Sequence, residues 1–466
     1  MICINDGIYF VGGNAEDVTG SCIYIRCMGK QILLECGMIQ SNDYLENYRR
    51  NSRKFKFNPK EIDYVFINHC HADHSGMLPR LVKQGFEGKI IATHSSALLM
   101  SKLLINSCYI LESEAATLSR IYHRDYEPLY NEDDVKETLN LIHEYDDSHK
   151  VYKLDDVVSF EWLDNSHCLG AKQLRLNLGT KHILYTSDLG AFSPNNHYVG
   201  NTEIDERHYD LAIMESTYGE PGRINKKTRK FDVEHLRVAI DTVLERNGTV
   251  ILPCFSFART QELLTTLYLI YEGGEAPDIV VDSKLSCEVT ELYDQLVDDE
   301  LWKKVRSWSS VTYIQDKEAS LACVKGHKPK VVISSSGFCT NGRVLSYLHE
   351  YLKDPNSMII FSGYIGNDNS YLSYRIKNYK ENKFLKISGD SVENKADCIS
   401  LTTFSSHMNR DELIKFGCSI NTNKLVLVHG STEAKNSLKE DLKKAISKND
   451  KTFKVVASVK DMTLHI

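Results

Sequence analysis

Three histidines and an aspartate fall within six positions, His69-Cys-His71-Ala-Asp73-His74, directly after the apolar run 64–67. That run is short and rich in β-branched and aromatic side chains, which is typical of a buried strand. Four polar, ligand-type side chains in a row do not suit a hydrophobic core. Their position directly after a strand therefore predicts a tight loop that carries all four of them. Imidazole nitrogens and a carboxylate on one loop suit a divalent ion such as zinc. A single histidine is more often a satisfied core or surface residue, but that explanation would have to cover four residues at once.

The rest of the chain allows large cores and offers no membrane segment. At 466 residues with 42% hydrophobic content, it could hold about two to four average domains. We found no apolar stretch of bilayer length, and the N-terminal residues MICINDGIYF lack the regions of a signal peptide. The thirteen cysteines are scattered without a C-x-x-C pair, which predicts reduced thiols and no thiolate zinc site. We therefore expect a cytoplasmic protein with no membrane partner.

The overall charge excludes one class of nucleic-acid binder. A formal net charge of −7 argues against a protein that coats nucleic acid through global positive charge. Two local basic stretches, 223–230 and 375–383, could still contact a polyanion. A solvated surface is the commoner explanation for either stretch taken alone.

The hydrophobic pattern changes along the chain. The first 200 residues mix short strands with a helical stretch between about 95 and 145, and the segments 22–26 and 31–35 suggest antiparallel strands. From about 217 the pattern becomes regular strand–helix alternation, which indicates a doubly wound parallel sheet. The helices expected there are 231–246, 258–271, 285–297, 343–352 and 370–378, and the strands are 249–252, 279–281, 331–334 and 358–361.

Further ligand-type residues stand at the ends of predicted strands. His167 follows the strand 157–162, Asp188 closes the run 183–188, and His407 closes the segment Thr403-Phe-Ser-Ser-His407. Together with the loop 69–74 these residues resemble the successive metal motifs of the metallo-β-lactamase fold. The segments Met214-Glu-Ser-Thr-Tyr-Gly219 and Ser334-Ser-Ser-Gly-Phe-Cys-Thr-Asn-Gly-Arg343 are similar to motifs of its β-CASP branch of RNA-processing nucleases.

This resemblance covers nearly the whole chain and implies an α/β fold with three segments. An αββα metallo-β-lactamase domain would occupy 1–216 and 385–466, and an inserted doubly wound β-CASP domain would occupy 217–384, with the active site in the cleft between them. The resemblance also implies two zinc ions per chain. His69, His71 and His167 would hold one ion, Asp73, His74 and His407 the other, and Asp188 would bridge them.

The catalytic residues implied by the resemblance are Asp73, Asp188, Glu215, Arg375 and His429. Glu215 matches an acidic motif that orients a general acid or a ligand histidine. Arg375 stands where the family is expected to have a histidine, and a guanidinium stabilises phosphate charge but does not donate a proton at neutral pH. His429 is a candidate for the acid or for a residue that supports a ligand. Glu35 stands where aspartate is usual and is expected to tune a ligand loop.

Substrate contacts are expected from Ser335, Ser336, Gly337 and Arg343, because backbone amides between a strand and a helix can receive a phosphate. Ordinary turn chemistry explains the serine stretch equally well. The function indicated is a zinc-dependent, endonucleolytic ribonuclease acting on single-stranded RNA. The alternatives are a hydrolase of DNA or of small esters or lactones, and an RNA-binding scaffold with a decayed site. The sequence leaves the oligomeric state open and allows a homodimer.

Overall fold

The computed structural model describes residues 5–194, 196–223, 227–366, 369–378, 380–448 and 452–465. The chain forms two compact units, and each is described by itself. The first comprises Met1–Pro194, Val199–Ile224 and Ser406–Ile466, and the second comprises Asn195–Tyr198 and Asn225–Ser405.

The first unit is built on two seven-stranded sheets. One has the order β24-β1-β2-β3-β4-β5-β6 and the other the order β23-β22-β12-β10-β9-β8-β7. The strands of the former are Gly7–Phe10 (β1), Ile23–Cys27 (β2), Lys30–Leu34 (β3), Tyr64–Phe66 (β4), Lys89–Ala92 (β5), Ile142–Glu144 (β6) and Thr463–Leu464 (β24). Those of the latter are Tyr152–Lys153 (β7), Val158–Asp164 (β8), Lys172–Leu178 (β9), Lys181–Tyr185 (β10), Leu211–Glu215 (β12), Lys424–Val428 (β22) and Lys454–Ala457 (β23). A short parallel pair joins His208–Tyr209 (β11) to Asn421–Thr422 (β21).

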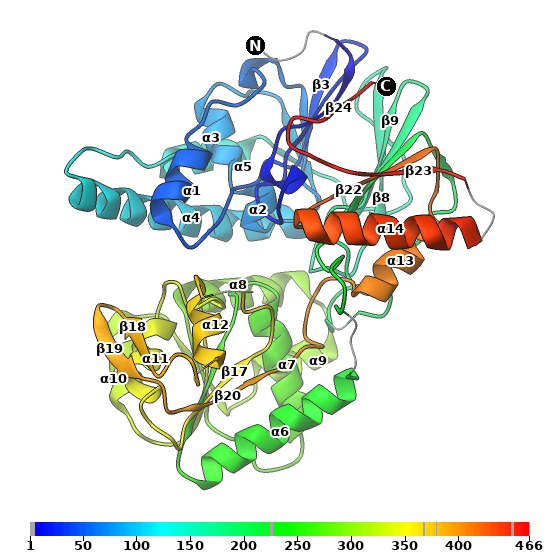
Figure 1. The fold of residues 1–466 in the computed structure, drawn as a ribbon. Helices are drawn as coiled ribbons and strands as arrows, with labels where there is room; N and C mark the ends of the chain where they lie inside the picture. Colours follow the sequence, from blue (N-terminus) through cyan, green and yellow to red (C-terminus); the bar gives the residue numbers. More distant parts are fainter. Residues whose placement is uncertain are drawn as a thin grey trace. The chain divides into compact units, whose positions relative to one another are not determined.

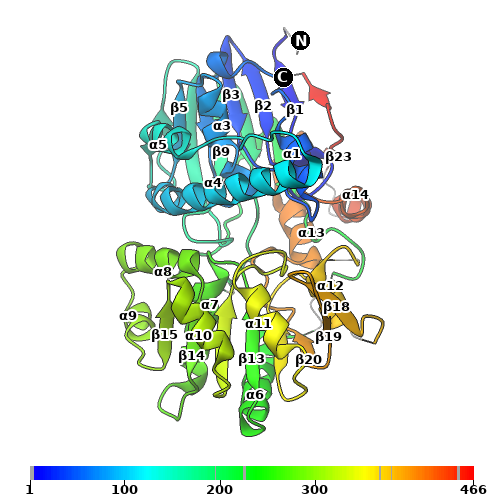
Figure 2. The same cartoon turned by 90° about the vertical axis from the view of Figure 1, so that its left-hand side faces the viewer.

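Apolar side chains from the inner faces of both sheets make one core. Phe66 of β4 contacts Phe160 and Trp162 of β8 edge-on, with ring centroids 5.2 and 6.4 Å apart. Helices cover the outer faces, as Figures 1 and 2 show. On the first sheet lie Tyr44–Asn51 (α1), Ala72–Ser75 (α2), Leu78–Lys83 (α3), His94–Tyr122 (α4) and Glu132–Asn140 (α5). Arg410–Ser419 (α13) and Thr432–Lys448 (α14) pack on the second. The predicted αββα sandwich is therefore confirmed.

The second unit contains a six-stranded, all-parallel sheet with the order β15-β14-β16-β13-β17-β20. Its strands are Thr249–Pro253 (β13), Ile279–Asp282 (β14), Val311–Ile314 (β15), Lys330–Ser334 (β16), Met358–Phe361 (β17) and Asp397–Ser400 (β20). Its helices are Arg229–Glu245 (α6), Arg259–Tyr271 (α7), Lys284–Leu296 (α8), Glu300–Arg306 (α9), Lys317–Lys325 (α10), Val344–Tyr351 (α11) and Leu372–Lys377 (α12). The predicted doubly wound sheet is present, and each helix and strand predicted within it ends no more than two residues from its observed bounds.

The return of the chain to the first unit lies later than the sequence suggested. The contact boundary falls between Ser405 and Ser406, not after 384, and the outward boundary falls after Ile224, not after 216. The physical reason is that β20 pairs in parallel with β17 as the edge strand of the second unit's sheet. The antiparallel hairpin of Phe384–Ile387 (β18) and Asp390–Glu393 (β19) packs into the same core. Residues 385–405 therefore belong to the second unit.

Candidate metal centre

The strands of the first unit bring the candidate ligands to one edge. β10, β12 and β22 are parallel neighbours, and β8 runs in the same direction because β9 is antiparallel to both β8 and β10. Parallel strands end at the same edge of a sheet, so the residues after β8, β10 and β22 meet there. Those residues include His167, Asp188 and His429.

The loop after β4 is held against the segment that follows β3. The amides of Cys36 and Met38 donate to the carbonyl oxygens of His74 and Ala72, at 2.8 and 2.9 Å. At Gly37 a β-carbon would lie 1.7 Å from the carbonyl oxygen of Asp73, so only glycine allows this close approach. The short helix α2 follows and carries Asp73 and the buried His74.

Three imidazoles form the first ligand group, which consists of His69, His71 and His167. One nitrogen of each lies within 4.8 Å of the others, and Nε2 of His167 is 3.3 Å from Nδ1 of His71. Burial and the neighbouring imidazoles hold the pKa of His69 and of His167 well below the usual value. Both rings are therefore neutral, which is the form that binds a metal ion.

The second ligand group consists of Asp73, His74, Asp188 and His429, whose ligand atoms also lie within 4.8 Å of one another. Nε2 of His74 is 3.6 Å from Oδ2 of Asp73 and 3.3 Å from Oδ1 of Asp188. Nε2 of His429 is 3.5 Å from Oδ2 of Asp73. Imidazole nitrogens and carboxylate oxygens are the donors that divalent zinc accepts.

Asp188 stands between the two groups. Its Oδ2 lies 3.8 and 3.7 Å from Nε2 of His69 and His167, whereas its Oδ1 faces His74 in the second group. Burial alone would raise the pKa of this carboxyl, but the imidazoles of His429 and His74 outweigh burial and hold its pKa well below the usual value. The ionised carboxylate can therefore offer one oxygen to each group.

The residues present fit a pair of divalent ions. Nε2 of His69, Nε2 of His429 and Oδ1 of Asp188 are buried, and none of the three makes a hydrogen bond within the described part of the chain. Such atoms are costly to bury without a partner, and they converge on the two groups defined above. A bound ion in each group would satisfy all three.

His407 and His429 both lie at the metal centre, but their surroundings differ. His407 was predicted to bind the second ion; the structure places it in a further candidate group, with His167 and Asp188, and places His429 in the second group. His407 places Nδ1 3.0 Å from Oε1 of Glu215, while its Nε2 lies 4.0 Å from Oδ2 of Asp188. The reason lies in the register of β22 on β12, which brings His429 beside the end of β12, whereas His407 lies in the loop before α13. His407 as a ligand of the second ion therefore stays a prediction, and the structure adds His429 as a candidate ligand.

Two buried glutamates support the ligand histidines. Glu215 is fully buried and accepts hydrogen bonds from the amides of Leu189 and Thr217, at 2.6 and 3.1 Å, besides its contact with His407. Glu35 is also fully buried, and its Oε1 accepts a hydrogen bond from Ser187 Oγ at 2.9 Å and lies 3.4 Å from Nδ1 of His74. The extra methylene relative to aspartate still places this carboxylate against a ligand, as the sequence predicted.

The predicted substrate residues all lie in the second unit. Ser335 Oγ donates to Ser283 Oγ at 2.8 Å, and Ser336 Oγ contacts Thr340 and Asn341. Arg343 binds Oδ1 of the buried Asp282 at 2.7 Å and also donates to main-chain carbonyl oxygens at the end of β15. Arg343 is thus tied to the second unit by these contacts, and its role in substrate binding stays a prediction.

The other predicted cations differ in their surroundings. Arg375 lies on α12, and its buried Nε makes no hydrogen bond within the described residues. The basic stretch 223–230 lies partly outside the described residues. Within it, Arg229 contacts Glu262 and lies over the ring of Phe404, 3.5 Å from its centroid. Arg229 therefore packs inside the second unit.

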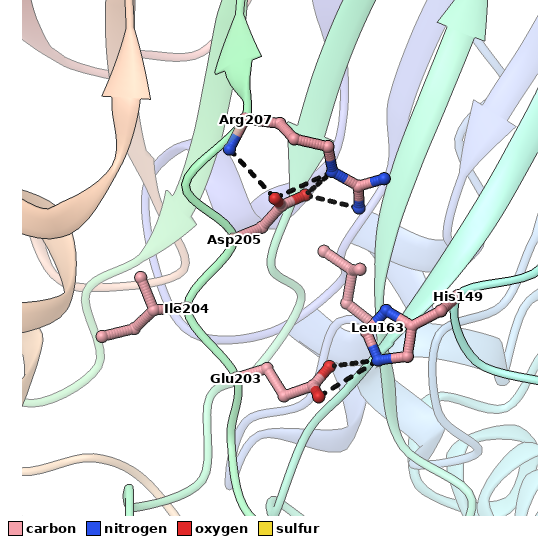
Figure 3. Close-up of a pocket in the computed structure, with 6 residues that line it drawn as sticks. All are labelled: His149, Leu163, Glu203, Ile204, Asp205 and Arg207. Carbon is pink, nitrogen blue, oxygen red and sulfur yellow. Dashed lines mark hydrogen bonds and ion pairs between the residues drawn. The ribbon is translucent and has the colours of Figure 1, made fainter.

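A separate pocket of the first unit lies beside β8 and is shown in Figure 3. Its lining residues are His149, Leu163, Glu203, Ile204, Asp205 and Arg207. Arg207 binds both oxygens of the buried Glu161, at 2.9 and 2.8 Å, and also pairs with Asp205. His149 pairs with Glu203 at 3.1 Å. The charges that line this pocket are thus largely compensated, and the pocket shares no residue with either ligand group.

Three family models match the chain over separate ranges. The metallo-beta-lactamase superfamily matches residues 15–105, the beta-Casp domain matches 260–369, and a Zn-dependent metallo-hydrolase RNA specificity domain matches 391–456. The first range contains the ligand loop, and the second contains the serine stretch and Arg343.

Curated relatives align over almost the whole chain. "Ribonuclease TTHA0252" of Thermus thermophilus is 28% identical, with 90% of this chain and 92% of the relative covered. An "RNase J-like protein" of Methanocaldococcus jannaschii is 26% identical, with 90% and 91% covered. "Integrator complex subunit 11" of Danio rerio is 25% identical over 93% of this chain and 71% of its own length.

A solved structure supports the fold alone. A protein of unknown function from Enterococcus faecalis V583 superposes with a TM-score of 0.56 at 14% identity and covers 99% of this chain and 100% of its own. The matched ranges include the ligand loop 69–74, the segment 334–343, His407 and His429, on both the sandwich and the inserted parallel sheet. The chain therefore belongs to the β-CASP branch of the metallo-β-lactamase superfamily of metal-dependent hydrolases.

Proposed function

We propose that the protein is a zinc-dependent ribonuclease that cleaves phosphodiester bonds within single-stranded RNA. The observation that carries the proposal is the pair of ligand groups that share Asp188, since two adjacent ions on one carboxylate suit phosphodiester hydrolysis. RNA as the substrate is supported by the match to an RNA specificity domain and by relatives named as ribonucleases.

The residues divide into holding, bridging and proton-handling roles. In this proposal His69, His71 and His167 hold one ion, Asp73, His74 and His429 hold the other, and Asp188 contacts both. Two zinc ions would supply a bound hydroxide at neutral pH and neutralise charge on the phosphate. The protein itself keeps the first-group imidazoles neutral by burial, so they are ready to bind an ion.

His407 is the proposed proton donor to the leaving oxygen. Its hydrogen bond with the buried Glu215 and the charge of that carboxylate raise the pKa of His407 to about 9, although burial alone would lower it. A protonated imidazole beside the metal groups can donate to an alkoxide, and a carboxylate that orients it completes a familiar acid–base arrangement. His407 would thus supply the general acid that Arg375 cannot be, because a guanidinium does not donate a proton at neutral pH.

An endonucleolytic mode is proposed because relatives of this chain carry the name endoribonuclease. We place the activity in the cytoplasm, in keeping with twelve free cysteines among the described residues. No helix among the described residues is long and apolar enough to cross a bilayer. The homodimer that the sequence allows stays a prediction, which light scattering of the purified protein would test.

The test uses 5′-labelled single-stranded RNA, DNA of the same sequence and a lactone, each with and without a zinc chelator. Internal RNA fragments that disappear with the chelator and in His71→Ala would support the proposal. Mononucleotides released from the 5′ end would overturn the endonucleolytic mode, and cleavage of DNA or of the lactone alone would overturn the RNA substrate. Failure of the folded, zinc-loaded protein to cleave any substrate would favour a binding scaffold.

A further inference from the structure

Thr217 makes a hydrogen bond to a candidate ligand that none of the roles above explains. Its Oγ1 lies 3.0 Å from Nδ1 of His429 and donates to the carbonyl oxygen of His429 at 3.3 Å. Thr217 is the second residue after β12 and His429 the first after β22, and the register pairs Glu215 with Val428. The parallel pairing of these two strands therefore places the hydroxyl beside the imidazole.

The hydroxyl group has one proton and the imidazole has two distinct nitrogens. A carbonyl oxygen can only accept, so the contact with the carbonyl of His429 uses the proton of the hydroxyl. The oxygen of Thr217 then acts as an acceptor towards Nδ1, so Nδ1 carries the proton when the ring is in the neutral form that binds a metal ion. In this tautomer the lone pair is on Nε2.

The surroundings of Nε2 agree with this assignment. Nε2 of His429 is buried, makes no hydrogen bond to any described residue and lies 3.5 Å from Oδ2 of Asp73 in the second ligand group. Oδ1 of Asp188 is 3.2 Å from Nδ1 but makes no hydrogen bond within the described part of the chain. Asp188 is itself a candidate ligand, so an ion in the site would engage its carboxylate and leave Thr217 as the acceptor for Nδ1.

We propose that Thr217 is a positioning residue that holds His429 in the tautomer protonated on Nδ1, so that Nε2 can bind the ion of the second group. This inference rests on the proposed function and deepens it. Thr217 is itself anchored, because its amide donates to Oε2 of Glu215 at 3.1 Å. One segment after β12 therefore orients His407 through Glu215 and His429 through Thr217.

The test compares Thr217→Val, which keeps the shape but removes the hydroxyl, with Thr217→Ser, which keeps the hydroxyl. Zinc is titrated into metal-free protein in competition with a chromogenic chelator. Loss of a hydrogen-bond partner behind a metal ligand typically weakens metal binding about 10–100-fold. We expect Thr217→Val to bind one of its two zinc ions weaker by about this factor, and Thr217→Ser to bind both nearly as the wild type does.

A second readout does not depend on activity. ¹⁵N NMR of histidine-labelled, metal-free protein distinguishes the two neutral tautomers, and His429→Gln identifies the signal of His429. We expect the proton on Nδ1 in the wild type and in Thr217→Ser, and a larger share on Nε2 in Thr217→Val. Unchanged thermal unfolding of each variant shows that the fold is intact. If Thr217→Val does not fold, Thr217→Ala takes its place.

The outcomes separate this inference from the proposed function. If the wild type binds two zinc ions and cleaves RNA but Thr217→Val matches it in affinity and tautomer, the positioning role is refuted and the function stands. If His429→Gln keeps both ions at wild-type affinity, His429 is not a ligand and the inference fails with it. A wild type that binds zinc but cleaves no RNA would refute the proposed function. The zinc affinities of Thr217→Val and Thr217→Ser would still decide whether Thr217 positions His429.

Discussion

Replacing Glu215 with glutamine would distinguish a proton-donating His407 from a metal-binding His407. The carboxylate of Glu215 accepts three N–H groups, from Leu189 at 2.6 Å, Thr217 at 3.1 Å and Nδ1 of His407 at 3.0 Å. A glutamine side chain has one acceptor oxygen, and its NH₂ group must face at least one of these donors. The variant therefore loses a charge-assisted hydrogen bond and leaves a buried donor unpaired.

The expected magnitude follows from these contacts. Such a lost bond and the unpaired donor together cost about 3 kcal/mol at a fully buried site. If His407 acts as the acid only when Glu215 orients and charges it, this energy appears in the transition state and slows RNA cleavage about 100-fold. Glu215 belongs to neither ligand group, so the zinc content of Glu215→Gln should equal that of the wild type.

The assay measures single-turnover cleavage of RNA and of bis(p-nitrophenyl) phosphate by the same zinc-loaded protein. Nitrophenolate leaves without a proton, so loss of a general acid should slow RNA cleavage much more than cleavage of this ester. His407→Ala should show the same selective loss. Equal losses on both substrates, accompanied by loss of one zinc ion from His407→Ala, would refute our reasoning and restore His407 as a ligand.

Three further predictions test the metal centre and the fold. Asp188→Asn should weaken the binding of both zinc ions, because its oxygens face both groups; metal analysis after dialysis would show this, and loss of one ion alone would contradict it. Arg343→Met should destabilise the second unit by about 3 kcal/mol, since it leaves the buried Asp282 without its cation, whereas a residue that only binds substrate would leave the unfolding temperature unchanged. Burial raises the pKa of Glu114 from 4.5 to about 7, so the folded state favours the protonated carboxyl and loses stability as pH rises from about 4.5 through 7. Glu114→Gln should therefore stabilise the protein by about 2 kcal/mol at pH 8 and by almost nothing at pH 4, as thermal unfolding at the two pH values would show.

Much of this protein could be predicted from the sequence, because the relevant signals are local. A strand pattern followed by four ligand-type residues describes a metal loop whatever the rest of the chain does, and the structure places those residues as two groups around Asp188. The strand–helix alternation after 217 likewise follows from the hydrophobic period of each local segment. The predicted bounds of these helices and strands agree with the observed bounds within two residues. Such patterns depend only on residues close in sequence, so they are the same whichever distant elements pack together.

The domain boundary near 405 could not be predicted from local sequence patterns. Strand β20 and the hairpin before it are short, and their patterns are the same whichever sheet they join. Pairing of β20 with β17 assigns them to the second unit, and that pairing joins residues about forty positions apart. The elements α9, β15 and α10 were missed because each is short and weakly patterned.

The chain by itself determined which side chains can bind metal and which elements carry them, because ligand chemistry and hydrophobic period are properties of the local sequence. Only the tertiary structure decided which histidine serves which purpose. His407 and His429 offer the same imidazole chemistry, but the register of β22 on β12 brings His429 to Asp73 and Thr217 and leaves His407 beside Glu215. The tertiary structure also brings Arg343 to the buried carboxylate of Asp282, which lies 61 residues away along the chain. Long-range packing selects among chemically equivalent residues, and no local pattern encodes that choice.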